Sequence, residues 1–202
     1  MSYYTDAATF VAKFEGYQPV ATWDVNAYRI GHGSDTITFN DGSYRKVVKG
    51  DTTTKDNAAK DLARRIPEFE NRIKNYIDNY AVTSEMWEDL PEPAKVGLIS
   101  FAYNYGNIVK TAIREAIKTG DVDKIADALL SSTKNDMITT KYYNGLQKRR
   151  QAEADLIRSQ KKKIKKKNFK ILGLSIGFLL MGSLLYYFRD DVKKEINKWV
   201  NY

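Results

Sequence analysis

The sequence contains no cysteine and a single histidine, His32, among its 202 residues. Without cysteine the chain has no disulfide bond, no thiolate metal site and no cysteine nucleophile. One histidine leaves no second imidazole for a histidine-rich metal site or for a Ser-His triad beside a metal. We therefore expect no metal and no cofactor, and any catalysis has to rely on carboxylates.

Most of the chain carries no net charge. Residues 1–160 hold 22 lysines and arginines and 22 acidic residues, whereas residues 161–202 hold 11 and 3. The whole formal net charge of +8 therefore lies in the last fifth of the sequence. Binding to nucleic-acid phosphates requires a basic patch on the folded body, so we expect no specific nucleic-acid partner.

The C-terminal region combines a lysine block with a long apolar run. Seven lysines lie between Lys161 and Lys170, and the uncharged run ILGLSIGFLLMGSLLYYF follows at 171–188. As a helix this run would extend about 27 Å at ~1.5 Å per residue, close to the ~30 Å core of a bilayer. The pattern predicts a juxtamembrane linker at 161–170, a transmembrane helix at 171–188 and an amphipathic interfacial tail at 189–202. A hydrophobic oligomerisation helix is the alternative, and Gly173 and Gly177 have the spacing for self-association into a homo-oligomer.

Residues 1–160 have the pattern of one folded domain of the α+β class, mostly α. Apolar spacing predicts a short helix over 6–14 that ends on Glu15, and alternation around Asn40-Asp41-Gly42 predicts a hairpin over 36–48. From Lys55 onward the patterning is helical, with breaks at prolines and glycines. The expected helices cover 55–65, 67–80, 92–105, 107–118, 121–131 and 144–160.

Two carboxylates stand between the first helix and the hairpin, Glu15 and Asp24. Cleaving a glycosidic bond requires one carboxylic acid to protonate the leaving oxygen and a second carboxylate to activate water or stabilise the cationic transition state. A cleft between a small sheet and a helical lobe suits a long substrate. With 25 acidic residues in the chain, however, this spacing alone does not distinguish the pair from surface charges.

Longer sequence motifs are more informative about the function of these two carboxylates. FEGYQPVATWD at 14–24, YRIGHGSDT at 28–36, SFAYNYG at 100–106 and GLQKRRQAEADLI at 145–157 together resemble the phage-type lysozymes of glycoside hydrolase family 24. The resemblance implies a lysozyme-like fold, Glu15 as general acid and Asp24 as second carboxylate. The family's third catalytic residue is a threonine, but Arg29 occupies that position here. Ser34 or Thr36 is therefore a candidate for the missing hydroxyl.

Other residues are candidates for supporting the site. The resemblance implies that an arginine of the last helix, Arg149 or Arg150, approaches the catalytic glutamate. Trp23 is a candidate for packing against a sugar ring, and Tyr28 and Arg29 are further candidates for supporting the site. We expect His32 to form local hydrogen bonds rather than to act in catalysis, and we expect the aromatic residues of 100–106 to belong mainly to the core.

The function that the resemblance implies is a phage muramidase that cleaves the β-1,4 glycan linkage of peptidoglycan. Seven lysines and arginines precede the apolar run and four follow it, which predicts a single-pass membrane protein with residues 1–160 made on the cytoplasmic side. The sequence start lacks the pattern of a signal peptide, in agreement with this topology. We expect the host inner membrane or an internal virion membrane as its location, and the lipid bilayer and capsid or vertex proteins as partners. It would then open the cell wall as infection begins.

Three alternatives remain open from the sequence. A structural virion membrane or vertex protein could retain a lysozyme fold without activity, because fold does not imply function. An exit-stage endolysin would use the same chemistry at the end of infection. A lytic transglycosylase would require only the glutamate.

Overall fold

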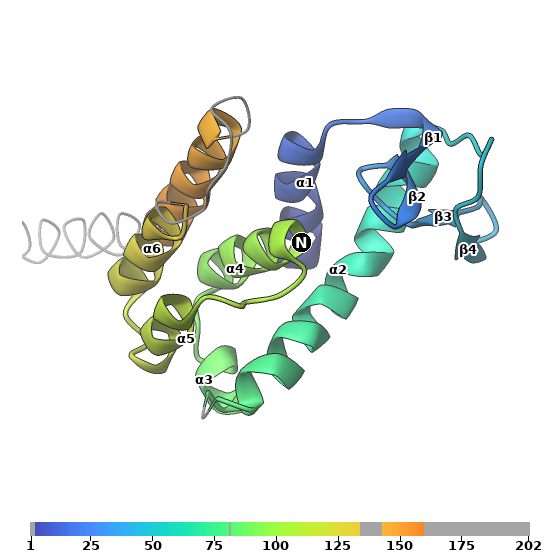
Figure 1. The fold of residues 1–202 in the computed structure, drawn as a ribbon. Coiled ribbons are helices and arrows are strands. Elements are labelled where there is room, and N and C mark those ends of the chain that lie inside the picture. Colours follow the sequence, from blue (N-terminus) through green and yellow to red (C-terminus); the bar gives the residue numbers. More distant parts are fainter. Residues whose placement is uncertain (1–2, 81, 134–142, 160–202) are drawn as a thin grey trace, which may run out of the picture. The chain divides into compact units, whose positions relative to one another are not determined.

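A computed structural model describes residues 3–80, 82–133 and 143–159 (Figure 1). The chain divides into two units, residues 1–160 and 161–202, and the first contains every residue described below. The predicted linker, transmembrane helix and tail at 161–202, including Gly173 and Gly177, lie outside the described residues.

The first unit begins with helix α1 (Tyr3–Glu15), as the apolar spacing predicts, and α1 ends on Glu15. Gly16 follows with a φ of 67°, a left-handed conformation that glycine adopts without steric cost. Strands β1 (Gln18–Asp24) and β2 (Ala27–Gly31) then form an antiparallel pair. This first hairpin was not predicted, because its segment shows polar and glycine-rich composition without clear alternation.

The predicted second hairpin is confirmed. Strands β3 (Thr36–Thr38) and β4 (Tyr44–Lys46) pair antiparallel around the Asn40-Asp41-Gly42 turn. Gly42 has a φ of 84°, which the tight turn requires. The two hairpins form a small lobe whose own core consists of Ile30, Ile37 and Val47.

The break predicted at Pro67 is wrong. Helix α2 (Lys55–Asp78) continues through this proline for 24 residues, with Thr54 as its N-cap. Proline costs the helix one backbone hydrogen bond, but the apolar residues on both sides of it, Ile66 and Phe69, are buried in the core. Tertiary packing therefore keeps the two halves of α2 in one helix, which extends from the small lobe to the helical lobe (Figure 1).

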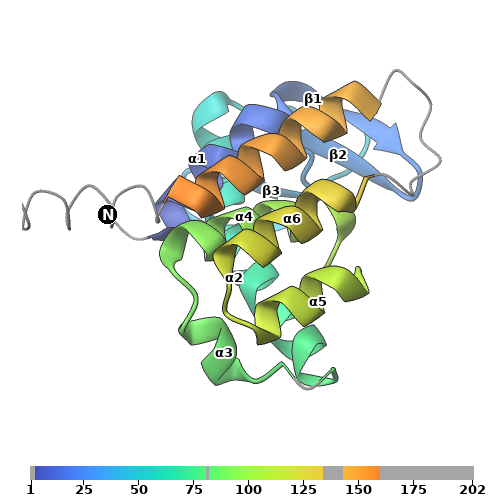
Figure 2. The same ribbon diagram turned by 90° about the vertical axis from the view of Figure 1, so that its left-hand side faces the viewer.

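The helical lobe is built around α4 (Glu92–Tyr105), whose bounds match the predicted 92–105. Buried residues occupy all faces of α4 between Ala94 and Ala102, and this helix packs against α1, α2 and α6. The remaining helices are α3 (Ser84–Glu88), α5 (Thr111–Lys118), α6 (Val122–Ser131) and a last helix over 143–159. Figure 2 shows the last helix beside α1.

Close approach of the last helix to α4 depends on Gly97. A Cβ atom at this position would lie 2.9 Å from the side chain of Ile157 and 3.4 Å from the carbonyl oxygen of Glu153. Because glycine has no side chain, the two helices approach closely enough to enclose the polar groups that lie between them. This contact brings the last helix to the site described below.

A buried carboxylate, Glu70, ties α1 and α3 to α2. It accepts hydrogen bonds from Tyr3 Oη at 2.5 Å and Trp87 Nε1 at 2.8 Å, and it pairs with Lys74 at 2.9 Å. Burial alone would raise the pKa of Glu70, but the hydrogen bonds from Tyr3, Tyr4, Lys74 and Trp87 lower it to about 2. The folded protein therefore favours the ionised form of this side chain.

We expect Glu70→Gln to destabilise the protein in a pH-dependent manner. A carboxylate with a lowered pKa stabilises the folded state above its ordinary pKa of 4.5, and this contribution is lost as the pH falls toward about 2. The difference in unfolding free energy from the wild type should be on the order of 2–3 kcal/mol at pH 7 and should shrink between pH 4.5 and pH 2.5. Urea unfolding at several pH values measures it, with the exposed Glu115→Gln on α5 as control. A difference that stays constant with pH would contradict the prediction.

Candidate active site

Glu15 is fixed at the C-terminal end of α1 by an arginine from the last helix. Arg149 Nη1 donates to Glu15 Oε1 at 2.6 Å, and the two side chains are 5% and 20% exposed. Of the two arginines considered from the sequence, Arg149 is thus the one that contacts Glu15. On the other side of the glutamate, a Cβ atom at Gly33 would lie 3.4 Å from Glu15 Oε2. The carboxyl group is therefore confined between the last helix and the turn that follows β2.

Behind Arg149 lies a buried polar network. Arg149 Nη2 donates to the backbone oxygen of Ser100 at 2.9 Å, and Arg149 Nε lies 3.3 Å from Glu153 Oε1. Arg150 pairs with the other oxygen of Glu153 at 2.6 Å and donates to Asn104. Arg150 therefore supports Glu153 instead of contacting Glu15.

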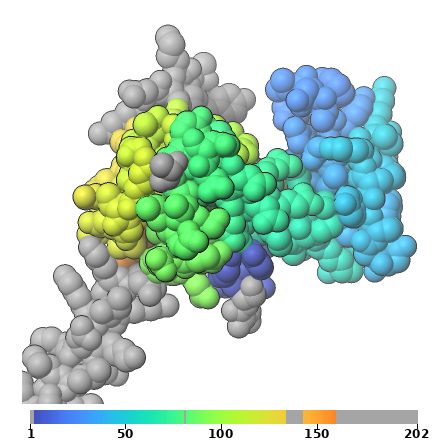
Figure 3. Space-filling model, turned by 90° about the horizontal axis from the view of Figure 1, so that it is seen from below, coloured from blue at the N-terminus to red at the C-terminus, as the bar shows by residue number. Residues whose placement is uncertain are grey.

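Glu15 lies in the wall of a cleft of about 610 Å³ between the small lobe and the helical lobe. Figure 3 shows the hollow between the two lobes, with α2 joining them. The lining side chains come from the end of α1, the first hairpin, α2 and α4. They include Glu15, Gln18, Thr22, Trp23, Asp24, Arg29, Arg65, Phe69, Arg72, Tyr103 and Asn104.

Asp24 lines the same cleft from the tip of the first hairpin. Its side chain is 63% exposed and lies 3.8 Å from Arg29 Nε, so this carboxylate is accessible to substrate and water. The neighbouring Val25 adopts a φ of 47°, an unfavourable conformation for a β-branched residue. The strained turn directs the chain back into β2 immediately after Asp24.

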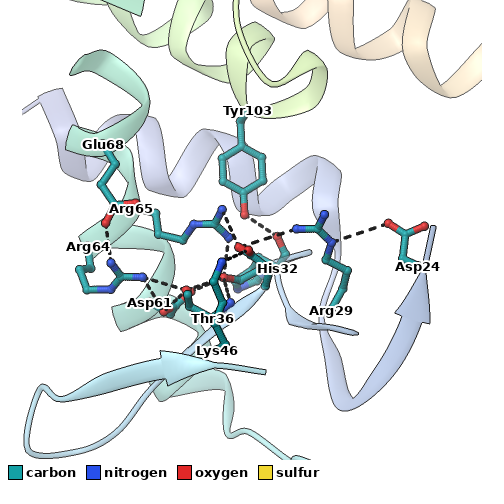
Figure 4. A network of polar contacts seen from close by, with 12 residues as sticks. Asp24, Arg29, His32, Thr36, Lys46, Asp61, Arg64, Arg65, Glu68 and Tyr103 are labelled. Atoms are coloured by element: carbon teal, nitrogen blue, oxygen red, sulfur yellow. Dashed lines mark hydrogen bonds and ion pairs between the residues drawn. The ribbon is translucent and has the colours of Figure 1, made fainter. Parts of the chain in front are cut away.

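Arg29, which stands where the resemblance would place a threonine, points toward Asp24 (Figure 4) and also contacts Asp35. Its guanidinium group is 3.8 Å from Asp24 and 3.7 Å from Asp35. Asp35 also contacts Lys46 at 2.5 Å and Arg65 at 3.2 Å. Burial would raise the pKa of Asp35, but these cations lower it overall. Arg29 therefore connects the exposed carboxylate at the cleft to a cluster of paired charges.

Ser34 and Thr36, the two candidates for the missing hydroxyl, do not line this cleft. Both donate to Asp61 of α2: Ser34 Oγ at 2.5 Å and Thr36 Oγ1 at 3.0 Å. Thr38 Oγ1 donates to the same carboxylate at 2.7 Å, and Arg64 Nη2 donates at 3.1 Å (Figure 4). This cluster attaches the second hairpin to α2. A threonine hydroxyl that does line the cleft is that of Thr22, which accepts from Gln18 Nε2 at 2.6 Å.

His32 joins the turn after β2 to the end of α1. Its Nδ1 atom makes a short hydrogen bond with the backbone oxygen of Gly16, and its own backbone oxygen accepts from Tyr103 Oη at 2.7 Å. Burial raises the pKa of Tyr103, so this phenol remains a hydrogen-bond donor. His32 thus makes the local bonds expected of it, and these bonds position the turn that contacts Glu15.

Several cleft and network residues were not found from the sequence, including Asp61, Arg65, Arg72 and Glu153. One available signal was the alternation of Ser34, Thr36 and Thr38, because alternate residues of a strand share one face. Three hydroxyls on one face indicate a common buried partner. Among the described residues, no group of three or more metal-ligating side chains comes together.

Comparisons with known proteins agree with this geometry. The phage lysozyme family model matches residues 12–153. The chain belongs to the phage lysozyme family. This phage lysozyme is therefore a lysozyme-type glycoside hydrolase, and peptidoglycan hydrolysis is its activity class. The expectation of an enzyme is confirmed.

Two solved structures share the fold. The active form of the endolysin Lyz of phage P1 has a TM-score of 0.54 and 18% identity, over 76% of this chain and 84% of that chain. A mutant of the lysozyme of phage P22 has a TM-score of 0.54 and 19% identity, over 75% of this chain and 94% of that chain. A search of curated protein sequences gave no match.

The predicted location of this phage lysozyme as a single-pass membrane protein requires correction. Among residues 3–80, 82–133 and 143–159, no helix is both long enough and apolar enough to cross a bilayer, and the structural neighbours are an endolysin and a lysozyme. The run at 171–188 predicts a span because its length and lack of charge match a bilayer core, but it lies outside the described residues. The virion-associated role rested on that span, and no residue in the described part supplies another reason for it.

Proposed function

We propose that this phage lysozyme acts as a muramidase that cleaves the β-1,4 glycan linkage of peptidoglycan, with Glu15 as general acid and Asp24 as second carboxylate. The observation that carries this proposal is the placement of both carboxylates in one cleft of about 610 Å³. One is fixed by a buried arginine, and the other is exposed at a hairpin tip. This division between a confined acid and an accessible carboxylate suits the two roles that glycoside hydrolysis requires.

Arg149 gives Glu15 a fixed orientation throughout the proposed reaction. A general acid must lie within hydrogen-bond reach of the leaving oxygen. The bond from Arg149 occupies Glu15 Oε1, and Oε2 lies beside Gly33, which lines the same cleft. The cation favours the ionised glutamate, whereas burial favours the protonated one. After the proton is transferred, Arg149 stabilises the carboxylate that remains.

The small lobe supplies groups for holding substrate and water. Trp23 is 62% exposed at the cleft, and its ring packs edge-on against Tyr28 with centroids 5.2 Å apart. This fixed aromatic face suits contact with a sugar ring. Because Ser34 and Thr36 are bonded to Asp61, we assign the water-positioning hydroxyl to Thr22, which lines the cleft in the same strand as Asp24.

Analysis of the soluble products from purified peptidoglycan tests the proposed reaction. Hydrolysis leaves a new reducing sugar at each cut, so we expect muropeptides with reducing N-acetylmuramic acid ends. Mass spectrometry distinguishes these products from anhydro-sugars, which have one water fewer. Hydrolysed products would support the muramidase.

A lytic transglycosylase is the second candidate, because its chemistry requires only the acid, and Glu15 is the more tightly held of the two carboxylates. Anhydromuramic acid ends as the main product would establish this alternative and would remove the proposed role of Asp24. Release of free peptides without new sugar ends would contradict both assignments.

A further inference from the structure

The polar network behind Glu15 contains a second carboxylate besides Glu15 and the two arginines, and the proposed reaction does not explain its function. Glu153 is fully buried, with 0% of its surface exposed. It belongs to the last helix, and its side chain pairs with both Arg149 and Arg150. Burying a carboxylate in a protein interior is strongly unfavourable unless it is paired and hydrogen-bonded. A purely structural role would be filled as well by packed apolar residues, so the placement of this charge beside Arg149 requires another explanation.

We propose that Glu153 is a positioning residue that sets the pH range over which Glu15 holds its proton, acting through Arg149. This inference rests on the proposed role of Glu15 as general acid. One guanidinium group joins the two carboxylates: Arg149 Nη1 contacts Glu15 at 2.6 Å, and Arg149 Nε lies 3.3 Å from Glu153. The negative charge of Glu153 offsets part of the positive charge that Glu15 experiences.

The geometry also fixes the orientation of Arg149. Ser100 Oγ donates to Glu153 Oε1 at 2.6 Å, and the backbone oxygen of Ser100 accepts from Arg149 Nη2 at 2.9 Å. Arg149 is therefore held on its rear side by α4 and by Glu153, and only Nη1 is directed to Glu15. Arg150 approaches Glu153 from the opposite side at 2.6 Å. Burial raises the pKa of Glu153, although Arg150, Ser100 and Arg149 oppose this effect.

Other residues near Glu15, several of them charged or titratable, come from different elements. Tyr103 of α4 interacts electrostatically with Glu15, Asp61, Arg65 and Arg149. His32 and Gly33 approach from the turn after β2. Asp24 and Arg29 line the same cleft from the first hairpin. These groups remain unchanged when Glu153 is replaced, so a change in the pH profile reports the charge at residue 153.

The test is the pH profile of peptidoglycan hydrolysis by the full chain with Glu153→Gln. The alkaline limb of such a profile reports loss of the proton from the general acid. Without the charge of Glu153, Arg149 and Arg150 favour ionised Glu15, so we expect the alkaline limb to move about 0.5 to 1 pH unit toward acid. Activity at the acidic end should stay within about twofold of the wild type, because Glu15 is protonated there in both proteins.

Two further variants keep the test decisive. Glu70→Gln removes another buried carboxylate, which contacts Tyr3 at the far end of α1, about 18 Å from Glu15 along the helix. Glu70→Gln should leave the alkaline limb of the pH profile unchanged. Ser100→Ala keeps all four charges and removes the hydroxyl that stabilises ionised Glu153. It should move the alkaline limb of the pH profile toward acid by a smaller amount than Glu153→Gln. This variant replaces Glu153→Gln in the test if Glu153→Gln does not fold.

The outcomes separate this inference from the proposed function. An unshifted limb in Glu153→Gln, or in Ser100→Ala if the first variant does not fold, would overturn the role of Glu153. An equal shift in Glu70→Gln would show that the limb responds to general destabilisation, and it would overturn the inference as well. If Glu15→Gln keeps its activity, the assignment of the general acid itself is wrong, whatever the other variants show.

Discussion

We expect Glu15→Gln to lower the rate of peptidoglycan hydrolysis by at least about 100-fold, the lower end of what general acid catalysis contributes. The amide has nearly the same shape as the carboxylic acid, but it cannot transfer a proton to the leaving oxygen. Its oxygen can still accept the hydrogen bond that Arg149 donates to Glu15 Oε1. The fold should therefore persist, with a melting temperature within a few degrees of the wild type.

Release of reducing ends from purified peptidoglycan measures this effect. A matched control is Glu115→Gln, which makes the same chemical change at an exposed residue of α5 outside the cleft. The control should retain the wild-type rate. If Glu15→Gln keeps more than about a tenth of the wild-type rate, Glu15 is not the general acid, since even a modest acid contribution exceeds this factor.

We expect Asp61→Ala to lower the free energy of unfolding strongly. The side chain of Asp61 is buried and accepts hydrogen bonds from Ser34, Thr36, Thr38 and Arg64. Removing the carboxylate leaves these donors, one of them charged, without their acceptor. Breaking a buried ion pair from one side typically costs about 3–5 kcal/mol, and we expect a loss of this size in the free energy of unfolding.

Urea unfolding at pH 7 measures this loss, with Asp56→Ala as control. Asp56 belongs to the same helix, but its side chain is 75% exposed and pairs with Lys60 at the surface, so its removal should cost less than about 1 kcal/mol. Asp61→Asn, which keeps one acceptor oxygen, should fall between the two. A loss below about 1 kcal/mol for Asp61→Ala would show that the cluster does not hold the second hairpin on α2.

The site also depends on the Asp61 cluster. Ser34 directly follows Gly33, whose backbone confines Glu15, and it donates to Asp61. Releasing Ser34 from α2 would loosen the turn on one side of the catalytic carboxyl group. The stability of the small lobe and the placement of Glu15 are thus linked through a single buried carboxylate.

Local sequence patterns were enough to predict those helices and turns whose ends do not depend on residues distant in the chain. The end of α1 on Glu15 followed from Gly16, the second hairpin from Asn40-Asp41-Gly42, and the bounds of α4 from its prolines and Gly106. These signals act within a few residues, because caps and turns are set by backbone conformation and nearby hydrogen bonds. The sequence segments at 14–24, 28–36, 100–106 and 145–157 together carried the family resemblance.

Tertiary structure decided the features that depend on partners distant in the chain. Pro67 does not end a helix, since Ile66 and Phe69 beside it are buried in the core. Ser34 and Thr36 bond to Asp61 instead of lining the cleft, because this buried acceptor of α2 lies within hydrogen-bond distance of both hydroxyls. Arg149 rather than Arg150 contacts Glu15, because Glu153 and α4 hold the two arginines in different directions. A sequence shows which charges are available, but burial and distance, which only the fold sets, decide which of them interact.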